Sequence, residues 1–186
     1  MEKVQKAAEE LLLAVGPDAA SIPEIAKLSG ITRASIYQFF PDKYSLFSQL
    51  AVNHMNSISQ LLQSHGSSGH NQSQDWCNSL KSAIRIISDY YRANPVACIL
   101  LMRGHFTQAD REAHVAKDTA FGELLRTLLA KQGYSGHLPT HPDAATIAIE
   151  ITFSVMKFGF AQEGTITQAI EEEASRACIA YLNVFV

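Results

Sequence analysis

The residues best suited to recognise another molecule lie in one short polar segment, residues 30–43. Arg33, Ser35 and Gln38 are expected to face outward from a short helix within this segment. A guanidinium can bind guanine O6 and N7 with two hydrogen bonds, and a glutamine amide can do the same with adenine N6 and N7. The chemistry that these side chains favour is therefore hydrogen bonding to the edges of DNA bases.

Neighbouring residues suit the phosphate groups that flank those bases. Tyr37 and Lys43 offer a phenol and an ammonium group, and Ser21 stands at a helix N-terminus, which attracts anions. The predicted DNA contacts are Ser21, Thr32, Arg33, Ala34, Ser35, Tyr37, Gln38 and Lys43.

Two helices joined by a tight turn are needed to present this surface. Ser21 and Glu24 form a capping box, and Pro23 lies in the first turn of a helix that ends before Gly30. Gly30 supplies the left-handed residue of the turn, and Thr32 can cap the second helix. The residues expected to fill the core beneath the turn are Ile25, Ile31, Ile36 and Phe39. This order of elements is a helix-turn-helix.

The rest of the chain also has the periodicity of helices. Apolar residues recur at three- and four-residue spacing, and no segment alternates as a strand would. Gly16 is expected to end the first helix, a capping box of Thr140 and Asp143 to open the eighth, and Thr165 to open the ninth. The predicted fold is all-α, with about nine helices.

The eighth predicted helix, residues 140–164, is apolar around almost its whole circumference. Such a helix must be covered on all sides, whereas the other helices of one chain cover only one side. We therefore expect a symmetric homodimer, in which the eighth and ninth helices of two chains form a four-helix bundle.

Composition places the chain among globular proteins. It has 186 residues, 47% of them hydrophobic, and a net charge of −3, which disfavours a general polyanion binder. No run of about 18 or more apolar residues predicts a membrane span, and the sequence shows no signal-peptide pattern. The three cysteines are far apart, which indicates reduced thiols and a cytoplasmic protein.

A second set of residues is suited to bind a small apolar molecule. These residues lie in the middle of the fifth to eighth predicted helices and are rich in aromatic rings and thioethers, which suit a flat or aliphatic ligand. The predicted ligand contacts are Tyr90, Tyr91, Met102, Phe106, Phe121, Leu125, Phe153, Met156 and Phe160. Arg103 and His105 are expected near the mouth of the pocket, where they could contact an acidic group.

A metal-dependent enzyme is an alternative interpretation. Asp110, His114 and Asp118 are spaced i, i+4 and i+8 on one helical face, close to His105, and such groups can bind a metal. The same spacing also suits a solvated face whose charges pair with neighbours such as Lys117. Because the sequence shows no nucleophile–base pair and no glycine-rich phosphate loop, we predict neither an enzyme nor a metal or other cofactor.

The sequence resembles the TetR family of bacterial transcription regulators from Lys3 to Phe47. The residues that carry the resemblance are Ser21…Ile25-Ala26…Gly30-Ile31-Thr32 and Ile36-Tyr37…Phe40-Pro41-Asp42-Lys43…Leu46. Two positions depart from the family pattern, since Ala34 stands where glycine is frequent and Tyr44 where an acidic residue is common. The resemblance implies a dimer that reads a palindromic operator and a variable helical domain that binds a small ligand and releases DNA.

Together these patterns predict a cytoplasmic, homodimeric repressor with two domains. Residues 1–47 are expected to bind DNA, and residues 48–186 to bind the ligand and form the dimer. A small, largely hydrophobic effector is expected to release the protein from its operator by a population shift. The alternative is a DNA-binding dimer of the same fold that takes no small molecule and is controlled by a protein partner.

Overall fold

The computed structural model describes residues 1–67, 75–103, 108–134 and 138–185. Within these residues the chain forms nine α-helices and no β-strand, so the prediction of an all-α fold is confirmed. The helices are α1 (Glu2–Ala19), α2 (Ile22–Ser29), α3 (Arg33–Tyr37), α4 (Lys43–Ser67), α5 (Trp76–Ala93), α6 (Pro95–Met102), α7 (Gln108–Lys131), α8 (Ala144–Glu163) and α9 (Gln168–Leu182).

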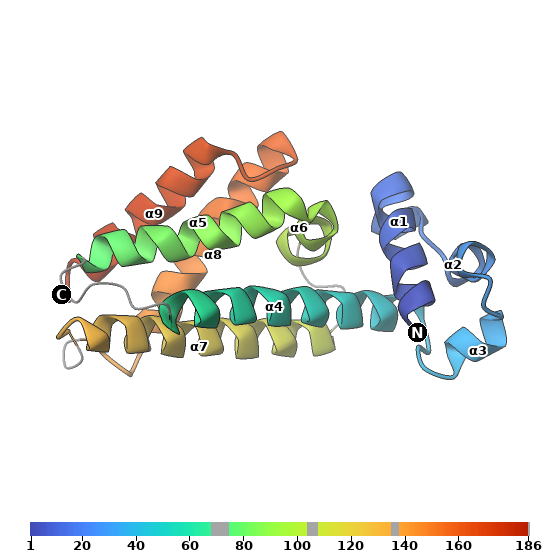
Figure 1. Cartoon of the computed structure of the whole chain (residues 1–186), viewed down its shortest axis with the longest axis horizontal. Helices are drawn as coiled ribbons and strands as arrows, with labels where there is room; N and C mark the ends of the chain where they lie inside the picture. Colours follow the sequence, from blue (N-terminus) through green and yellow to red (C-terminus); the bar gives the residue numbers. More distant parts are fainter. Residues whose placement is uncertain (68–74, 104–107, 135–137, 186) are drawn as a thin grey trace.

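Helices α1, α2 and α3, with the first turns of α4, form an N-terminal unit at one end of the molecule (Figure 1). Its core contains Ile25, Ile36 and Leu46, all fully buried. The regular part of α1 ends at Gly16, whose φ of 75° lies in the left-handed region, and a short helical turn follows. The predicted stop of the first helix is therefore confirmed.

The prediction that Phe39 fills this core is wrong, because Phe39 is 62% exposed and Phe40 is buried in its place. The reason is that α3 ends at Tyr37, earlier than the helical spacing assumed. The backbone N–H groups of Phe39 and Phe40 both donate to the Ile36 carbonyl, so the chain turns tightly there. This turn brings the second phenylalanine into the core and leaves the first on the surface.

Helix α4 runs from the N-terminal unit into the rest of the molecule without interruption (Figure 1). Leu46 and Phe47 in its first turns are buried, while further along it packs on α5, α6 and α7. The predicted domain boundary after residue 47 lies inside this helix. A single uninterrupted helix therefore connects the two parts of the protein.

Helices α8 and α9 begin later than their predicted caps. The N-cap of α8 is Asp143, whose carboxylate accepts from Thr146 N at 3.2 Å, and the N-cap of α9 is Thr167, whose hydroxyl accepts from Ile170 N at 3.4 Å. The chain before α8 is held in a turn instead, because Arg126 donates to the carbonyl oxygens of Leu138 and Pro139 and also pairs with Asp143.

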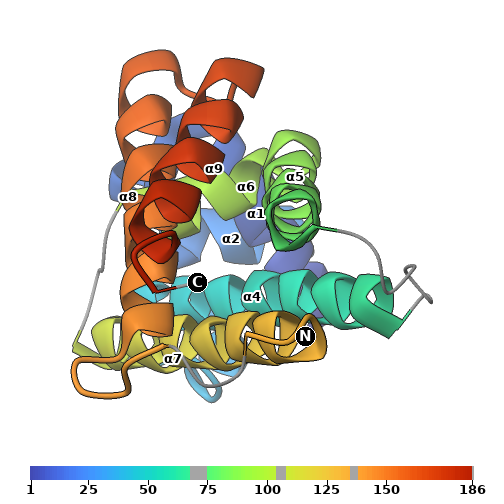
Figure 2. The same cartoon turned by 90° about the vertical axis from the view of Figure 1, so that its left-hand side faces the viewer.

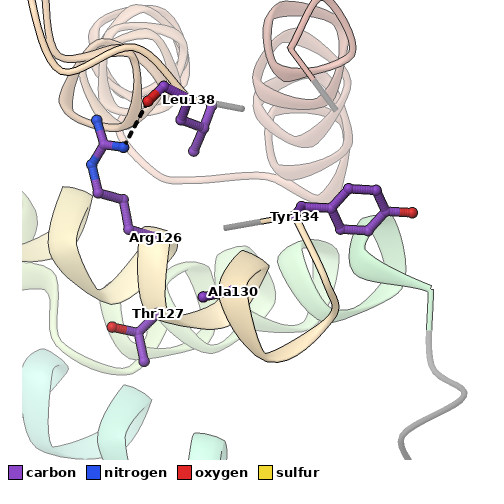
Figure 3. A pocket seen from close by; sticks show the side chains of 5 residues that line it. All are labelled: Arg126, Thr127, Ala130, Tyr134 and Leu138. Atoms are coloured by element: carbon purple, nitrogen blue, oxygen red, sulfur yellow. Dashed lines mark hydrogen bonds between the residues drawn. The ribbon is translucent and has the colours of Figure 1, made fainter. Parts of the chain in front are cut away.

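A hollow of about 190 Å³ lies beside this clamp, and Figure 3 shows Arg126 reaching from α7 towards Leu138. Because the Arg126 guanidinium is already occupied by backbone carbonyls and a carboxylate, the hollow is a by-product of the turn.

Helices α8 and α9 pack side by side, and α7 lies against α8 (Figures 1 and 2). The helices cross closely at two glycines. A Cβ on Gly159 would come within 2.4 Å of the Ile170 side chain, and a Cβ on Gly122 would come within 3.0 Å of the Thr146 backbone nitrogen. Small residues at these crossings fix how α8 is seated between its neighbours.

Helix α8 is left partly uncovered by a single chain, as the sequence predicted. Its length and mean hydropathy of 1.4 would also suit a membrane span, but only 39% of that apolar stretch is buried in the molecule. Ala148, Phe153 and Met156 face the core, whereas Phe158 is 64% exposed. An apolar face of α8 is thus left on the surface.

Candidate DNA-binding surface and ligand cavity

The turn between α2 and α3 is built by local hydrogen bonds. Glu24 N donates to Ser21 Oγ at 3.5 Å, which is the N-cap hydrogen bond of the predicted capping box, and the Ser21 hydroxyl donates to the Glu24 carboxylate at 2.7 Å. Gly30 has a φ of 68°, and Ser35 N donates to Thr32 Oγ1 at 3.2 Å. These contacts fix the start and the direction of α3.

The residues predicted to read bases lie together on the outer side of the N-terminal unit. Arg33, Ala34, Tyr37 and Gln38 are exposed, and Ser35 is half-buried beside the Thr32 cap. Tyr37 is 49% exposed and therefore does not belong to the core. The short helix α3 thus presents a guanidinium, a carboxamide and a phenol in the direction of solvent.

Lys43, predicted to contact phosphate, has another role in this structure. Its ammonium group donates to the carbonyl oxygens of Pro17 and Asp18, at 3.0 and 2.8 Å. The side chain therefore ties the start of α4 to the end of α1. Asp42 caps α4, and the hydrogen bonds that it accepts from the Ser45 N–H and hydroxyl hold its pKa below the ordinary value.

Sequence reasoning missed Phe39 as a member of this surface. It is exposed next to the end of α3, close in sequence to Tyr37 and Gln38, and adds an apolar group to a polar face. The spacing from Ile36 would place it in the core only if α3 continued for another turn. The pair Phe39-Phe40 before Pro41 was the signal that only one of the two rings could be buried.

A cavity of about 480 Å³ lies between α4, α5, α7 and α8, a volume typical of small-molecule sites. Three predicted ligand contacts line it, namely Phe121, Leu125 and Phe153. The lining residues are Leu62, Gln63, Ser79, Leu80, Ala83, Ile84, Ile87, Phe121, Leu124, Leu125, Thr127, Leu128, Lys131, Gln132, Ile149, Thr152 and Phe153.

The other predicted ligand contacts that the structure describes do not line this cavity. Tyr91, Met102 and Met156 are buried in the core, Phe160 is half-buried, and the Tyr90 hydroxyl forms a hydrogen bond with His54 Nδ1 at 2.7 Å. Phe106 lies outside the described residues. These side chains lie on helix faces that neighbouring helices cover. The sequence alone does not show which faces are covered in this way.

The residues predicted at the mouth of the pocket also differ from those that the structure shows there. Arg103 is exposed and does not line the cavity, and His105 lies outside the described residues. Sequence reasoning missed the polar end of the cavity, which Gln63, Lys131 and Gln132 form. Their position near helix ends was the available signal.

The face of α7 that carries the residues of the alternative metal interpretation is buried where the structure describes it. His114, Lys117 and Asp118 are all buried, and Lys117 Nζ lies 2.7 Å from Asp118 Oδ1. Lys117 Nζ also lies 4.0 Å from the centre of the Phe153 ring, a cation–π contact. Burial lowers the pKa of Lys117, and the Asp118 carboxylate opposes this shift.

No group of three or more potential metal ligands occurs among the described residues. His105 and the side chain of Asp110 lie outside that part of the chain. The aspartate that can be placed, Asp118, is paired with Lys117.

A polar contact links the N-terminal unit to the helical domain. His54 on α4 bonds the Tyr90 hydroxyl on α5, and its Nε2 lies 3.8 Å from a Glu9 carboxylate oxygen on α1. Burial lowers the pKa of His54 and raises that of Glu9. Near neutral pH the imidazole is therefore uncharged, and it packs between three helices.

Residues 5–50 match the family model described as bacterial regulatory proteins, tetR family. No curated protein matches the chain by sequence. The whole chain superimposes on solved structures that it resembles in sequence only weakly. One is a TetR-family transcriptional regulator from Streptomyces coelicolor, with a TM-score of 0.75, 19% identity, and coverage of 100% of this chain and 98% of that chain.

Two further structures share the fold. The fatty acid degradation regulator FadR from Bacillus halodurans has a TM-score of 0.71 and 16% identity, and covers 97% of this chain and 93% of its own. The complex of SmeT with triclosan has a TM-score of 0.66 and 17% identity, with coverage of 100% and 90%.

A helix-turn-helix that matches the family model, joined to a helical domain in the TetR arrangement, defines the class of this protein. The N-terminal unit is the DNA-binding domain of the tetR family of bacterial regulatory proteins, as the sequence predicted, and the whole chain has the fold of TetR-family transcriptional regulators.

The lowered pKa of His54 predicts how stability depends on pH. Below the ordinary value of 6.5, the unfolded chain binds a proton that folded His54 resists, so folding loses stability as the pH falls from about 6.5 towards the lowered pKa. His54→Gln should reduce this loss, as measured by urea unfolding between about pH 7.5 and 5.5. His141→Gln, at an exposed histidine, is the control. An unchanged pH slope in His54→Gln would remove His54 as the source.

Proposed function

We propose that the protein is a repressor that binds a palindromic operator as a homodimer and is released by a small, largely hydrophobic effector. The observation that carries the proposal is the apolar cavity between α4, α5, α7 and α8, in a chain whose N-terminal unit binds DNA. The cavity favours a small molecule over control by a protein partner. We propose no enzymatic activity, and we expect a DNA-binding protein of this kind to act in the cytoplasm.

DNA reading is assigned to α3. Arg33 and Gln38 are exposed on a helix whose start is fixed by the Thr32 cap, and arginine and glutamine are suited to guanine and adenine in the major groove. Tyr37 and the N-terminus of α2, which the half-buried Ser21 caps, would contact phosphates. The Lys43 ammonium group donates to two carbonyls at the end of α1, which leaves one of its three donors for a phosphate.

Dimerisation is assigned to α8 and α9. Ile147, Ile151, Ser154 and Phe158 recur at helical spacing on the side of α8 away from the buried Ala148 and Phe153. A second copy would cover this face and form a four-helix bundle. Two copies of α3 could then reach successive major grooves of a palindromic site.

The effector is proposed to act through α8 and α6. Phe153 on α8 lines the inner end of the cavity, and α6 packs against both α8 and α1. A ligand that displaces Phe153 would therefore shift helices that hold the N-terminal unit. This changes the distance between the two copies of α3, provided that the ligand prefers the state that does not bind DNA.

The relatives support an apolar effector. SmeT is solved with triclosan, and FadR from Bacillus halodurans is a fatty acid degradation regulator. Most residues that line the cavity of this chain are aliphatic or aromatic, which suits molecules of comparable polarity.

Removing the base-reading guanidinium tests the DNA surface. Arg33→Ala should weaken operator binding by about 1–3 kcal/mol and relax preference at one base position, as measured by fluorescence anisotropy on a selected operator and its single-base variants. Arg111→Ala, at an exposed arginine on α7, is the matched control. Equal affinity of Arg33→Ala and wild type for every site would exclude Arg33 from the reading surface.

Introducing a charge on α8 tests the dimer. Phe158→Glu should convert a dimer into a monomer, because the carboxylate would be buried without a partner at the interface. Light scattering should then report the chain mass of 20.4 kDa in place of twice that value. Val115→Glu, at an exposed apolar residue on α7, should remain dimeric. A monomeric wild type, or a dimeric Phe158→Glu, contradicts this assignment.

Filling the cavity tests effector control. Leu128→Trp should lower affinity for a releasing compound at least about tenfold, which corresponds to about 1.4 kcal/mol, while operator binding is retained. Leu61→Trp, at an exposed leucine that does not line the cavity, controls for the substitution itself. Operator release in Leu128→Trp at wild-type ligand concentrations would place the effector elsewhere.

A further inference from the structure

Apart from Thr127 and Thr152, whose hydroxyls donate to carbonyls of their own helices, the polar residues described in the cavity lining lie at one end. Gln63 lies near the end of α4, Ser79 near the start of α5, and Lys131 and Gln132 at the end of α7. Gln132 Nε2 donates to Ser79 Oγ at 2.8 Å, which joins two of these elements directly. In Figure 1 these helix ends lie at the left of the molecule, on the side away from α1, α2 and α3.

The opposite end of the cavity is apolar. The Phe121 and Phe153 rings stack with centres 5.9 Å apart and planes inclined by 24°, and both side chains are buried. Phe121 and Lys131 are ten residues apart on α7, which corresponds to about 15 Å along the helix. The cavity is therefore elongated and runs from a polar end to an aromatic end.

Exposure shows which end opens to solvent. Gln63 and Lys131 are exposed, and Gln132 is half-buried, whereas Ile84, Phe121 and Phe153 are buried. A ligand that enters at the polar end can keep a charged group hydrated there, so it avoids the large cost of burying an unpaired charge. Only the rest of such a ligand needs to be apolar.

The charge at this end has one sign. Among the described residues that line the cavity, Lys131 is the single charged one, and none is an aspartate or glutamate. An ammonium group favours an anion such as a carboxylate and disfavours a cation. The amide groups of Gln63 and Gln132 can donate further hydrogen bonds to the same anion.

We propose that the effector is a monoanionic amphiphile, whose carboxylate lies at Lys131 and whose hydrocarbon tail extends to Phe121 and Phe153. This inference rests on the proposed function, since it names the ligand class of the same cavity. It assigns to Lys131 the contact with an acidic group that the sequence suggested for Arg103 and His105. The tail, at the inner end, is the part of the ligand that would press on Phe153.

Three compounds with the same hydrocarbon tail and different head groups test which head group the cavity prefers. Isothermal titration of the full-length protein with decanoate, decanol and decylamine should give the tightest binding for decanoate, about fivefold tighter than decanol, and the weakest for decylamine. In Lys131→Gln, the affinity for decanoate should fall to that for decanol, and decanol should bind as it does to wild type. Lys81→Gln, at an exposed lysine on α5 outside the cavity lining, should change neither.

The outcomes distinguish the ligand class from the proposed function. Equal affinity of wild type for decanoate and decanol, tighter binding of decylamine, or an unchanged preference for decanoate in Lys131→Gln would overturn the anionic head group. An effector cavity would still stand in each case. If none of the three compounds binds but an uncharged aromatic compound releases the operator, the amphiphile is overturned and the proposed function is retained. If Leu128→Trp also leaves that release unchanged, the cavity itself is not the effector site.

Discussion

The structure depends on the continuity of α4. Its first turns carry Leu46 and Phe47 into the core of the N-terminal unit, and its end carries Leu62 and Gln63 to the cavity. An α-helix resists bending because each turn is held by its own backbone hydrogen bonds, so the two ends cannot move independently. Lys43 and His54 strengthen this constraint, since their contacts fasten α4 to α1 and α5. In the proposed function, α4 would therefore be a second connection, beside α8 and α6, between the cavity wall and the DNA-binding surface.

The helical domain departs from good packing at two neighbouring places, and both are linked to Phe153. On one side lies a cavity that close packing would fill, and on the other the buried pair of Lys117 and Asp118. Burying an ion pair is costly unless its geometry is favourable, and a cavity forfeits dispersion contacts with every missing neighbour. Such departures from the optimum are expected where a protein binds ligands or changes state. Phe153 lines the ligand space and also contacts Lys117 of the charge pair, so a ligand that moves this ring would disturb both.

Local patterns in the sequence were sufficient for the helix-turn-helix. The Ser21 capping box, the left-handed Gly30 and the Thr32 and Asp42 caps depend on residues within three or four positions of each other. Phe39 was misplaced because a five-residue helix ends before its periodicity can be established. The cavity could be predicted only in part, since Phe121, Leu125 and Phe153 were named but Gln63 and Gln132 were not. Which helix faces meet is decided by tertiary packing, and that packing also buried His114 and Asp118 on a face read as solvated.

The central claim is that the helical domain holds an open, ligand-sized space between α4, α5, α7 and α8. A crystal structure of the purified protein tests it most directly, through the electron density in that space. Our account predicts a cavity of about 480 Å³, empty or holding an elongated molecule with its polar end towards Lys131. Density showing Phe121, Leu128 and Phe153 collapsed into a fully packed interior would contradict it and favour control by a protein partner.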